Sequence, residues 1–104
     1  MTFKTKMKIV HTGTDTKIMV LVNHPMEPGN RINKETGKPV PAHYIESMHF
    51  LQNNKTVADV SLGPGTAANP MTILMLRNIK AGDQIFVRWK DNRGMQGKAS
   101  QQVH

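Results

Sequence analysis

Hydrophobic and polar residues alternate in short segments of this chain, and turn-forming residues separate the segments. The clearest alternation places Ile85, Val87 and Trp89 on one side, with Arg88 and Lys90 on the other. A period of two residues is typical of a β-strand with one buried face. The same pattern, together with apolar runs between turn signals, predicts strands at residues 5–11, 16–23, 43–52, 56–60, 71–76, 84–90 and 97–103.

Two of these segments, residues 16–23 and 71–76, are apolar at both odd and even positions. A strand of this kind is buried on both faces. One face would form the core, and the other needs a cover from this chain or from a partner. By strand parity alone, the residues assigned to the partner side are Met19, Leu21, Leu74 and Leu76.

The first of these strands ends abruptly at His24, where the sequence His-Pro-Met-Glu-Pro-Gly begins. Pro25 and Pro28 cannot donate to a strand ladder, and Gly29 favours a turn. A long polar segment, residues 25–42, follows before the next apolar run. A loop of this length in a small domain is usually functional or mobile, and the sequence leaves both interpretations open.

Seven short strands at regular spacing, without an amphipathic helix, indicate an all-β fold. A length of 104 residues suits one domain, residues 1–104. The pattern favours an antiparallel, immunoglobulin-like β-sandwich of about seven strands. The polar last strand, residues 97–103, is predicted to lie at a sheet edge.

The chain is basic, with a net charge of +7, and contains no cysteine. This charge fits either a solvated basic surface or an acidic partner. Nucleic acid is disfavoured because the few aromatic residues form no stacking motif. No apolar run is long enough for a membrane span, and the basic N-terminal residues lack the apolar region of a signal peptide. We therefore expect no membrane insertion and no export signal in this sequence.

Catalytic and cofactor motifs are also missing from the sequence. Acids number only seven, and the serines have no arrangement that suggests a triad. The five histidines show no close pair at a metal-ligand spacing, so we predict no metal, no cofactor and no enzyme activity. His24 is interpreted as a strand-end residue that caps backbone groups or lies at an interface.

Several motifs, in order, resemble the SoxZ family over residues 6–103. The six residues from His24 to Gly29 resemble its His-Pro-Met-Glu-Thr-Gly signature, with Pro28 in place of threonine. The other matching segments are Lys38-Pro39-Val40-Pro41 before Tyr44-Ile45, Ala67-Ala68-Asn69-Pro70, and Gly82 before Ile85, Val87, Trp89, Asp91 and Gly94.

The resemblance implies an immunoglobulin-like, non-catalytic scaffold that forms a heterodimer or heterotetramer with SoxY. SoxY carries sulfur intermediates on a cysteine near its C-terminus during thiosulfate and sulfur oxidation, and the complex contacts other Sox enzymes transiently. The lack of cysteine in this chain agrees with that division of roles. The resemblance further implies a periplasmic location, reached by export together with a signal-bearing partner.

Two interaction hypotheses follow. The first places SoxY on the outer side of strands 16–23 and 71–76. The second brings the loops His24–Gly29 and Ala67–Pro70 together at one end of the sandwich, against SoxY's tail or a visiting enzyme. Its candidate contacts are His24, Pro25, Met26, Asn69 and Pro70. The alternative class is a stand-alone, basic immunoglobulin-like module that binds a ligand or another protein; a metal or nucleic-acid binder is a weaker third.

Overall fold

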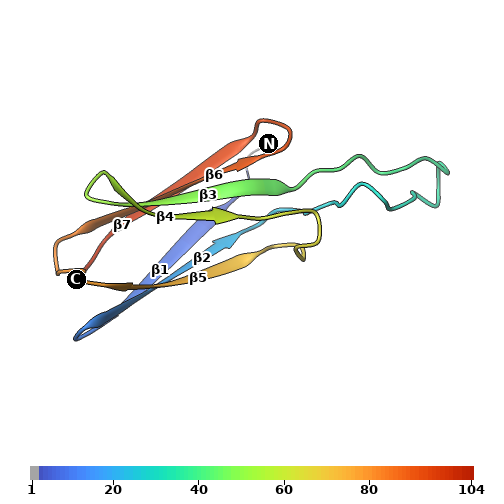
Figure 1. Ribbon diagram of the computed structural model, residues 1–104. Coiled ribbons are helices and arrows are strands. Elements are labelled where there is room, and N and C mark those ends of the chain that lie inside the picture. Colours follow the sequence, from blue (N-terminus) through green and yellow to red (C-terminus); the bar gives the residue numbers. More distant parts are fainter. Residues whose placement is uncertain (1–2) are drawn as a thin grey trace.

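The computed structural model describes residues 3–104 and contains seven β-strands (Figure 1). Every strand predicted from the sequence is present, with ends shifted by two residues at most. The strands are β1 (Thr5–Thr12), β2 (Asp15–Val22), β3 (Ile45–Gln52), β4 (Lys55–Ser61), β5 (Met71–Arg77), β6 (Gln84–Asp91) and β7 (Gln96–Gln102).

The strands form two antiparallel sheets packed face to face, which confirms the immunoglobulin-like sandwich. One sheet has three strands in the order β1-β2-β5, and the other has four in the order β4-β3-β6-β7. Strand β7 lies at an edge, as its polar sequence predicts. Across residues 3–104 the structure has no helix long and apolar enough to span a membrane.

The core lies between the sheets and follows the alternation of the sequence. Ile18, Val20 and Val22 are fully buried on β2, and Val87 and Trp89 are buried on β6. Further buried side chains come from β3, from β6 and from segments outside the strands: Met26, Ile45, Met48, Phe50, Ile79, Ile85 and Val103.

Strand register separates the four residues that parity assigned to one partner face. In the β2–β5 ladder, Ile18 pairs with Leu74, whereas Met19 pairs with Ile73. Residues paired across a ladder point to the same face of the sheet, so Leu74 lies on the inner face with Ile18 and packs against the core. Leu76 pairs with the buried Thr16 and also lies on the inner face. The prediction that Leu74 and Leu76 share an outer face with Met19 and Leu21 was therefore wrong. Strand β5 is apolar at both parities, and parity alone could not choose its buried face.

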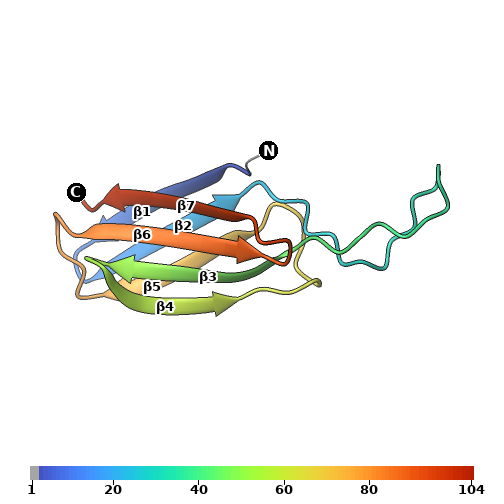
Figure 2. The ribbon, with the colours of Figure 1, turned by 90° about the horizontal axis from the view of Figure 1, so that it is seen from above.

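Residues 25–44 form a projecting hairpin that leaves the end of the sandwich where β2 stops and β3 begins (Figures 1 and 2). Two isolated antiparallel bridges, Glu27 with His43 and Ile32 with Pro39, hold its two legs together. The hairpin explains the elongated shape: the radius of gyration is 15.8 Å, against about 13 Å for a compact domain of 100 residues.

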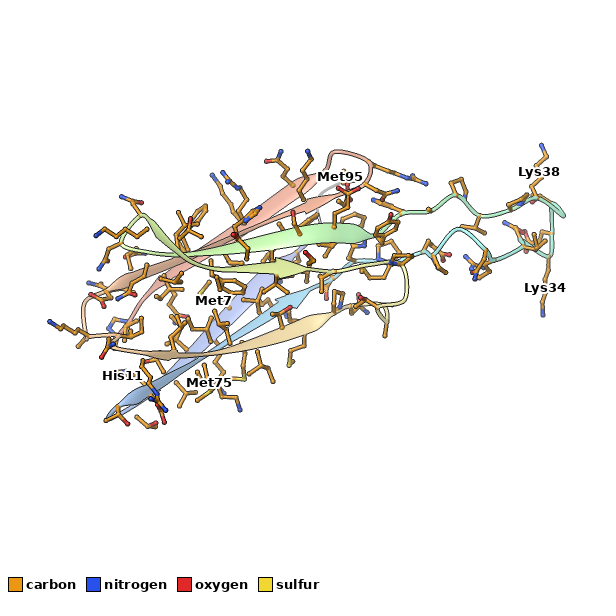
Figure 3. All side chains as sticks on the ribbon, in the orientation of Figure 1. Met7, His11, Lys34, Lys38, Met75 and Met95 are labelled. Carbon is orange, nitrogen blue, oxygen red and sulfur yellow. The ribbon has the colours of Figure 1, made fainter. Side chains whose placement is uncertain are left out.

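The tip of the projecting hairpin is a turn centred on Asn33. Its side-chain oxygen accepts a hydrogen bond from the backbone N–H of Glu35, and its carbonyl accepts one from Gly37. Lys34 and Lys38 extend away from this turn on opposite sides (Figure 3). The long polar segment of the sequence is therefore a hydrogen-bonded hairpin whose outer part lies beyond the core.

Candidate functional site

Two histidines mark the points where the projecting hairpin joins the sandwich. His24 lies two residues after the end of β2, and His43 lies two residues before the start of β3, so the two histidines lie at the bases of opposite legs. Both rings turn inward and meet Asp91, the last residue of β6. We call His24, His43 and Asp91 the clamp, because one carboxylate is bound by both legs.

The geometry of the clamp is that of a buried hydrogen-bond network. The distance from His24 Nε2 to Asp91 Oδ2 is 3.0 Å, and that from His43 Nε2 to the same oxygen is 2.7 Å. The side chains of His24 and Asp91 are fully buried, and that of His43 is 11% exposed. The second carboxylate oxygen accepts backbone N–H groups from Arg93 at 3.0 Å and Met95 at 2.8 Å.

These contacts fix the hydrogen positions on His24. The backbone N–H of Met26 donates to His24 Nδ1 at 3.1 Å, so Nδ1 must be the unprotonated nitrogen. The hydrogen of the neutral ring is therefore on Nε2, where it donates to Asp91. The pKa of Asp91 is lowered by its hydrogen bonds, which favours an ionised carboxylate that only accepts, so His43 is assigned a hydrogen on Nε2 that it donates to Asp91.

The environment shifts two pKa values in the clamp. Burial lowers the pKa of His24 below its ordinary value. The hydrogen bond that His24 donates to Asp91 opposes this lowering, and a charge on His43 would add to it. Burial by itself would raise the pKa of Asp91, but the hydrogen bonds from the two histidines and from the backbone of Met95 and Arg93 lower it. Both shifts favour an ionised aspartate beside a neutral His24.

Aromatic side chains surround the clamp and exclude water from it. The Phe3 ring lies 4.6 Å from the His24 ring and 5.4 Å from the His43 ring, measured between centroids. Trp89 packs edge-on against His24 at 5.7 Å and donates its Nε1–H to Thr5 Oγ1 at 2.8 Å. The clamp is thus joined to the core of the sandwich.

The three donor atoms of the clamp lie within 4.8 Å of one another, a spacing that would also suit a metal ion. A metal on His24 Nε2 would move the ring hydrogen to Nδ1, where it would face the N–H of Met26. Two donors would then oppose each other at 3.1 Å. The residues therefore fit a hydrogen-bond network and do not fit a metal centre.

The loops that the sequence analysis brought together do meet at this end of the sandwich. Asn69 accepts the backbone N–H of His24 through its side chain at 3.1 Å and donates its own N–H to the His24 carbonyl at 2.8 Å. Pro70 accepts the N–H of Val22. Pro25 is exposed and Met26 is buried, so only part of this loop pair faces solvent.

A second tie holds the other leg of the projecting hairpin. The side chain of Asn92 accepts the backbone N–H of Tyr44 at 2.8 Å and donates to the carbonyl of Ala42 at 3.0 Å. Asn69 bonds to the start of the first leg, Asn92 bonds to the second leg, and the clamp lies between them, so both legs are bonded to the sandwich. Side-chain hydrogen bonds therefore connect both legs to the sandwich at the base of the projecting hairpin.

The other candidate surface is the outer face of the three-stranded sheet. On β5, Met71, Ile73 and Met75 are 58%, 54% and 58% exposed, and Figure 3 shows Met75 on the side of β5 away from the four-stranded sheet. Met19 and Leu21 pair with Ile73 and Met71 and so lie on the same face. We call these five residues the outer apolar face.

Lysines border the outer apolar face along the neighbouring strands. Lys6 pairs with Leu21 and Lys8 with Met19 across the β1–β2 ladder, and Lys17 pairs with Met75 across the β2–β5 ladder. A shallow groove runs between these positions, lined by Lys6, Met7, Lys8, Met19, Leu21 and Met71. The surface therefore has an apolar centre with a positively charged border.

Sequence reasoning missed the clamp because it judged each histidine by its neighbours along the chain. The remaining histidines that the structure pairs make separate contacts: His11 with Thr16, and His49 with the exposed Asp59. The sequence does contain a signal for this pair, since His24 and His43 flank the two ends of the long polar segment. In a sandwich, such ends return to the same edge of the fold.

Fold and site together define a β-sandwich interaction module, in which a buried polar junction holds a projecting hairpin and one sheet presents an apolar face. A family model described as "Sulphur oxidation protein SoxZ" matches residues 4–102. The chain belongs to the SoxZ family. No curated protein matches it.

Membership of this family gives the chain a role in the Sox system of sulfur oxidation. The family is a non-catalytic subunit of that system and works within a complex of Sox partners, so the chain is not an enzyme. This agrees with the lack of catalytic motifs in its sequence.

Proposed function

We propose that this chain is the scaffold of the SoxYZ carrier, which holds SoxY while the C-terminal cysteine of SoxY bears the sulfur intermediates of thiosulfate oxidation. Family membership supports the Sox role. The sequence supplies no thiol that could itself carry sulfur. As part of the same proposal, the complex works in the periplasm and the chain is exported with its signal-bearing partner.

The outer apolar face carries the proposal that SoxY binds here. Three large apolar side chains on one strand, each more than half exposed, are unusual on a surface that meets only water. Edge strands are normally protected by charge, as Lys6 and Lys8 protect β1, but β5 has no charged residue before Arg77. A stable partner covering this face would bury an apolar centre and leave the rim polar.

The lysine border indicates the chemistry of the covering surface. A partner with an apolar centre and acidic residues around it would pair with Lys6, Lys8 and Lys17 while the apolar residues are buried. Charges at the rim mainly accelerate association and fix orientation, whereas burial at the centre supplies most of the affinity. The complex should therefore persist at high salt.

The substitution Ile73→Lys tests this assignment. It removes a half-exposed apolar side chain from the centre of the face and places an unpaired charge where the partner would bury it. Losses at such central positions are about 2 kcal/mol or more, so we expect SoxY to bind roughly thirtyfold or more weakly. Titration calorimetry of the two purified proteins measures the change.

The matched control is Ser100→Lys, the same new charge at an exposed position on β7, an edge strand of the opposite sheet. It should leave SoxY affinity unchanged, and circular dichroism should show both variants folded. Equal affinity for wild type and Ile73→Lys would show that SoxY binds elsewhere. A wild-type chain that does not bind SoxY at all would instead favour the stand-alone binding module.

The loops at the hairpin end extend the proposal to the visiting Sox enzymes. His24–Gly29 and Ala67–Pro70 are joined by the hydrogen bonds of Asn69 and lie beside the projecting hairpin. Pro70 is followed directly by Met71, so this end of the sandwich adjoins one end of the outer apolar face. It is our proposed place for contacts with SoxY's tail or with the enzymes that act on it.

A further inference from the structure

The clamp joins parts of the chain that leave different sheets. The first leg of the projecting hairpin continues from β2 of the three-stranded sheet, and the second leads into β3 of the four-stranded sheet. Asp91 lies on β6, beside β3, and receives one histidine from each leg. The carboxylate therefore fixes the spacing of the two legs at the point where they leave the core.

The bonds next to the clamp transmit this position into the hairpin. Met26 has a positive φ of 50° and is held by its N–H bond to His24 Nδ1. The following residue, Glu27, exchanges two backbone hydrogen bonds with His43, at 2.7 and 2.8 Å. If His24 leaves its position, Met26 loses its acceptor and the bridge between Glu27 and His43 loses its support.

A proton added to His24 would disrupt the clamp, because Nδ1 of that ring already accepts a hydrogen bond from the backbone N–H of Met26. A proton on Nδ1 of His24 would place two donors opposite each other at 3.1 Å, beside the His43 ring, whose centroid lies 4.6 Å from that of His24. Among residues 3–104, the rings of Phe3 and Trp89 that pack against the two histidines are uncharged, and Asp91 is the carboxylate that faces both histidines.

We propose that His24, Asp91 and His43 form a proton-sensitive clamp that sets the direction of the projecting hairpin and opens when His24 takes a proton on Nδ1. With the clamp closed, the hairpin keeps one direction relative to the sandwich. With it open, the hairpin samples many directions while the two sheets remain packed. This property is independent of the identity of the partner protein.

Double spin labelling can measure the direction of the hairpin, and the lack of native cysteine makes the labelling specific. One pair joins Thr36→Cys at the hairpin tip to Lys98→Cys on β7. A control pair, Lys8→Cys with Lys98→Cys, lies within the sandwich; all three positions are exposed. At pH 7.5 both pairs should give one narrow distance distribution.

Acidification should then broaden the distribution of the tip pair before that of the sandwich pair. A tip pair that is already broad at pH 7.5 would overturn the proposal, because the closed clamp would not be setting a direction. Broadening of both pairs at the same pH would overturn it as well, since the clamp would then open only when the whole fold does.

Substitutions at His43 test the clamp at neutral pH. His43→Ala removes the second donor to Asp91, so the tip pair should broaden and the backbone N–H of Glu27 should exchange with solvent about tenfold faster or more. His43→Gln offers an amide N–H near the position of Nε2 and should restore the narrow distribution. Because His43 is the least buried member of the clamp, these variants disturb the core least.

Asp91→Asn is a harsher second variant that weakens both histidine contacts and should broaden the tip pair further. A narrow distribution in both His43→Ala and Asp91→Asn would overturn the proposal. Equal broadening in His43→Ala and His43→Gln would also contradict it, because a general packing defect would then explain the change without the hydrogen bond.

Discussion

Gly97 on β7 faces the indole of Trp89, and the space between them leaves no room for a methyl group. The two residues pair across the β6–β7 ladder. A Cβ added at Gly97 would lie 2.3 Å from Nε1, 2.4 Å from Cε2 and 2.5 Å from Cζ2 of Trp89, whereas ordinary contacts lie at 3.4–4 Å. The substitution Gly97→Ala therefore forces the indole to move by about 1 Å.

Trp89 cannot move without loss, because it is buried and bonded on several sides. Its Nε1–H donates to Thr5 Oγ1 at 2.8 Å, and its ring packs against His24. Overpacking of a core costs about 1–3 kcal/mol, and the lost hydrogen bond about 1 kcal/mol. Alanine regains about 0.5–1 kcal/mol over glycine in a strand. The expected net loss is about 1–3 kcal/mol of the free energy of unfolding.

Urea unfolding, followed by the fluorescence of the single tryptophan, measures this loss directly. Gly63→Ala is the matched control, because nothing lies within 4 Å of its added Cβ and its φ is not positive. The control should change stability by less than about 0.5 kcal/mol or stabilise slightly. Equal unfolding midpoints and slopes for Gly97→Ala and wild type would refute the packing assigned to Trp89.

Two further predictions concern the junction at the hairpin base. The pKa of His24 in the folded chain lies below its ordinary value of 6.5, so on acidification the unfolded chain binds this proton first. The contribution of His24 to the free energy of unfolding should be full above about pH 7 and should fall below pH 6.5 by up to about 1.4 kcal/mol per pH unit. Urea titrations at several pH values measure this slope, which should be smaller in His24→Gln. A wild-type free energy of unfolding that stays constant down to pH 5.5 would contradict the prediction. Asn69→Ala loses the hydrogen bond to the His24 N–H and places alanine at a φ of 52°, which should lower the free energy of unfolding by about 2–3 kcal/mol. Asn69→Gly should lose less stability in thermal unfolding, because glycine tolerates that φ. Equal losses in the two variants would exclude a contribution from backbone strain.

The fold was predictable because most strands carry an unambiguous pattern. Ile85, Val87 and Trp89 were predicted to face inward and are buried. Asn53 and Asn54, of a residue type that tolerates positive φ, both have positive φ and connect β3 to β4. At these places local preference and the final packing agree.

The face of β5 was not predictable, because Met71, Ile73 and Met75 alternate with a set that is almost as apolar. Only the ladder with β2 shows which set points inward. Met19 and Leu21 were assigned to the outer face correctly, since the fully buried Ile18 and Val20 mark the inner parity of β2. Their contact with a partner stays a prediction.

The clamp depends on tertiary structure that no local pattern encodes. His24 and Asp91 are 67 residues apart, and His43 and Asp91 are 48 apart. Capping of backbone groups, one interpretation of His24, is confirmed by its bond with the N–H of Met26. The carboxylate that completes the network could be located only once β6 was placed beside β3.

Co-expression of the wild-type chain with SoxY, followed by size-exclusion chromatography with mass determination, tests the scaffold claim most directly. We expect a stable complex of one-to-one or two-to-two composition that persists in high salt, because its interface centre is apolar. A chain that elutes alone would contradict the scaffold role. A complex that forms at low salt and separates at high salt would contradict the apolar interface on β2 and β5.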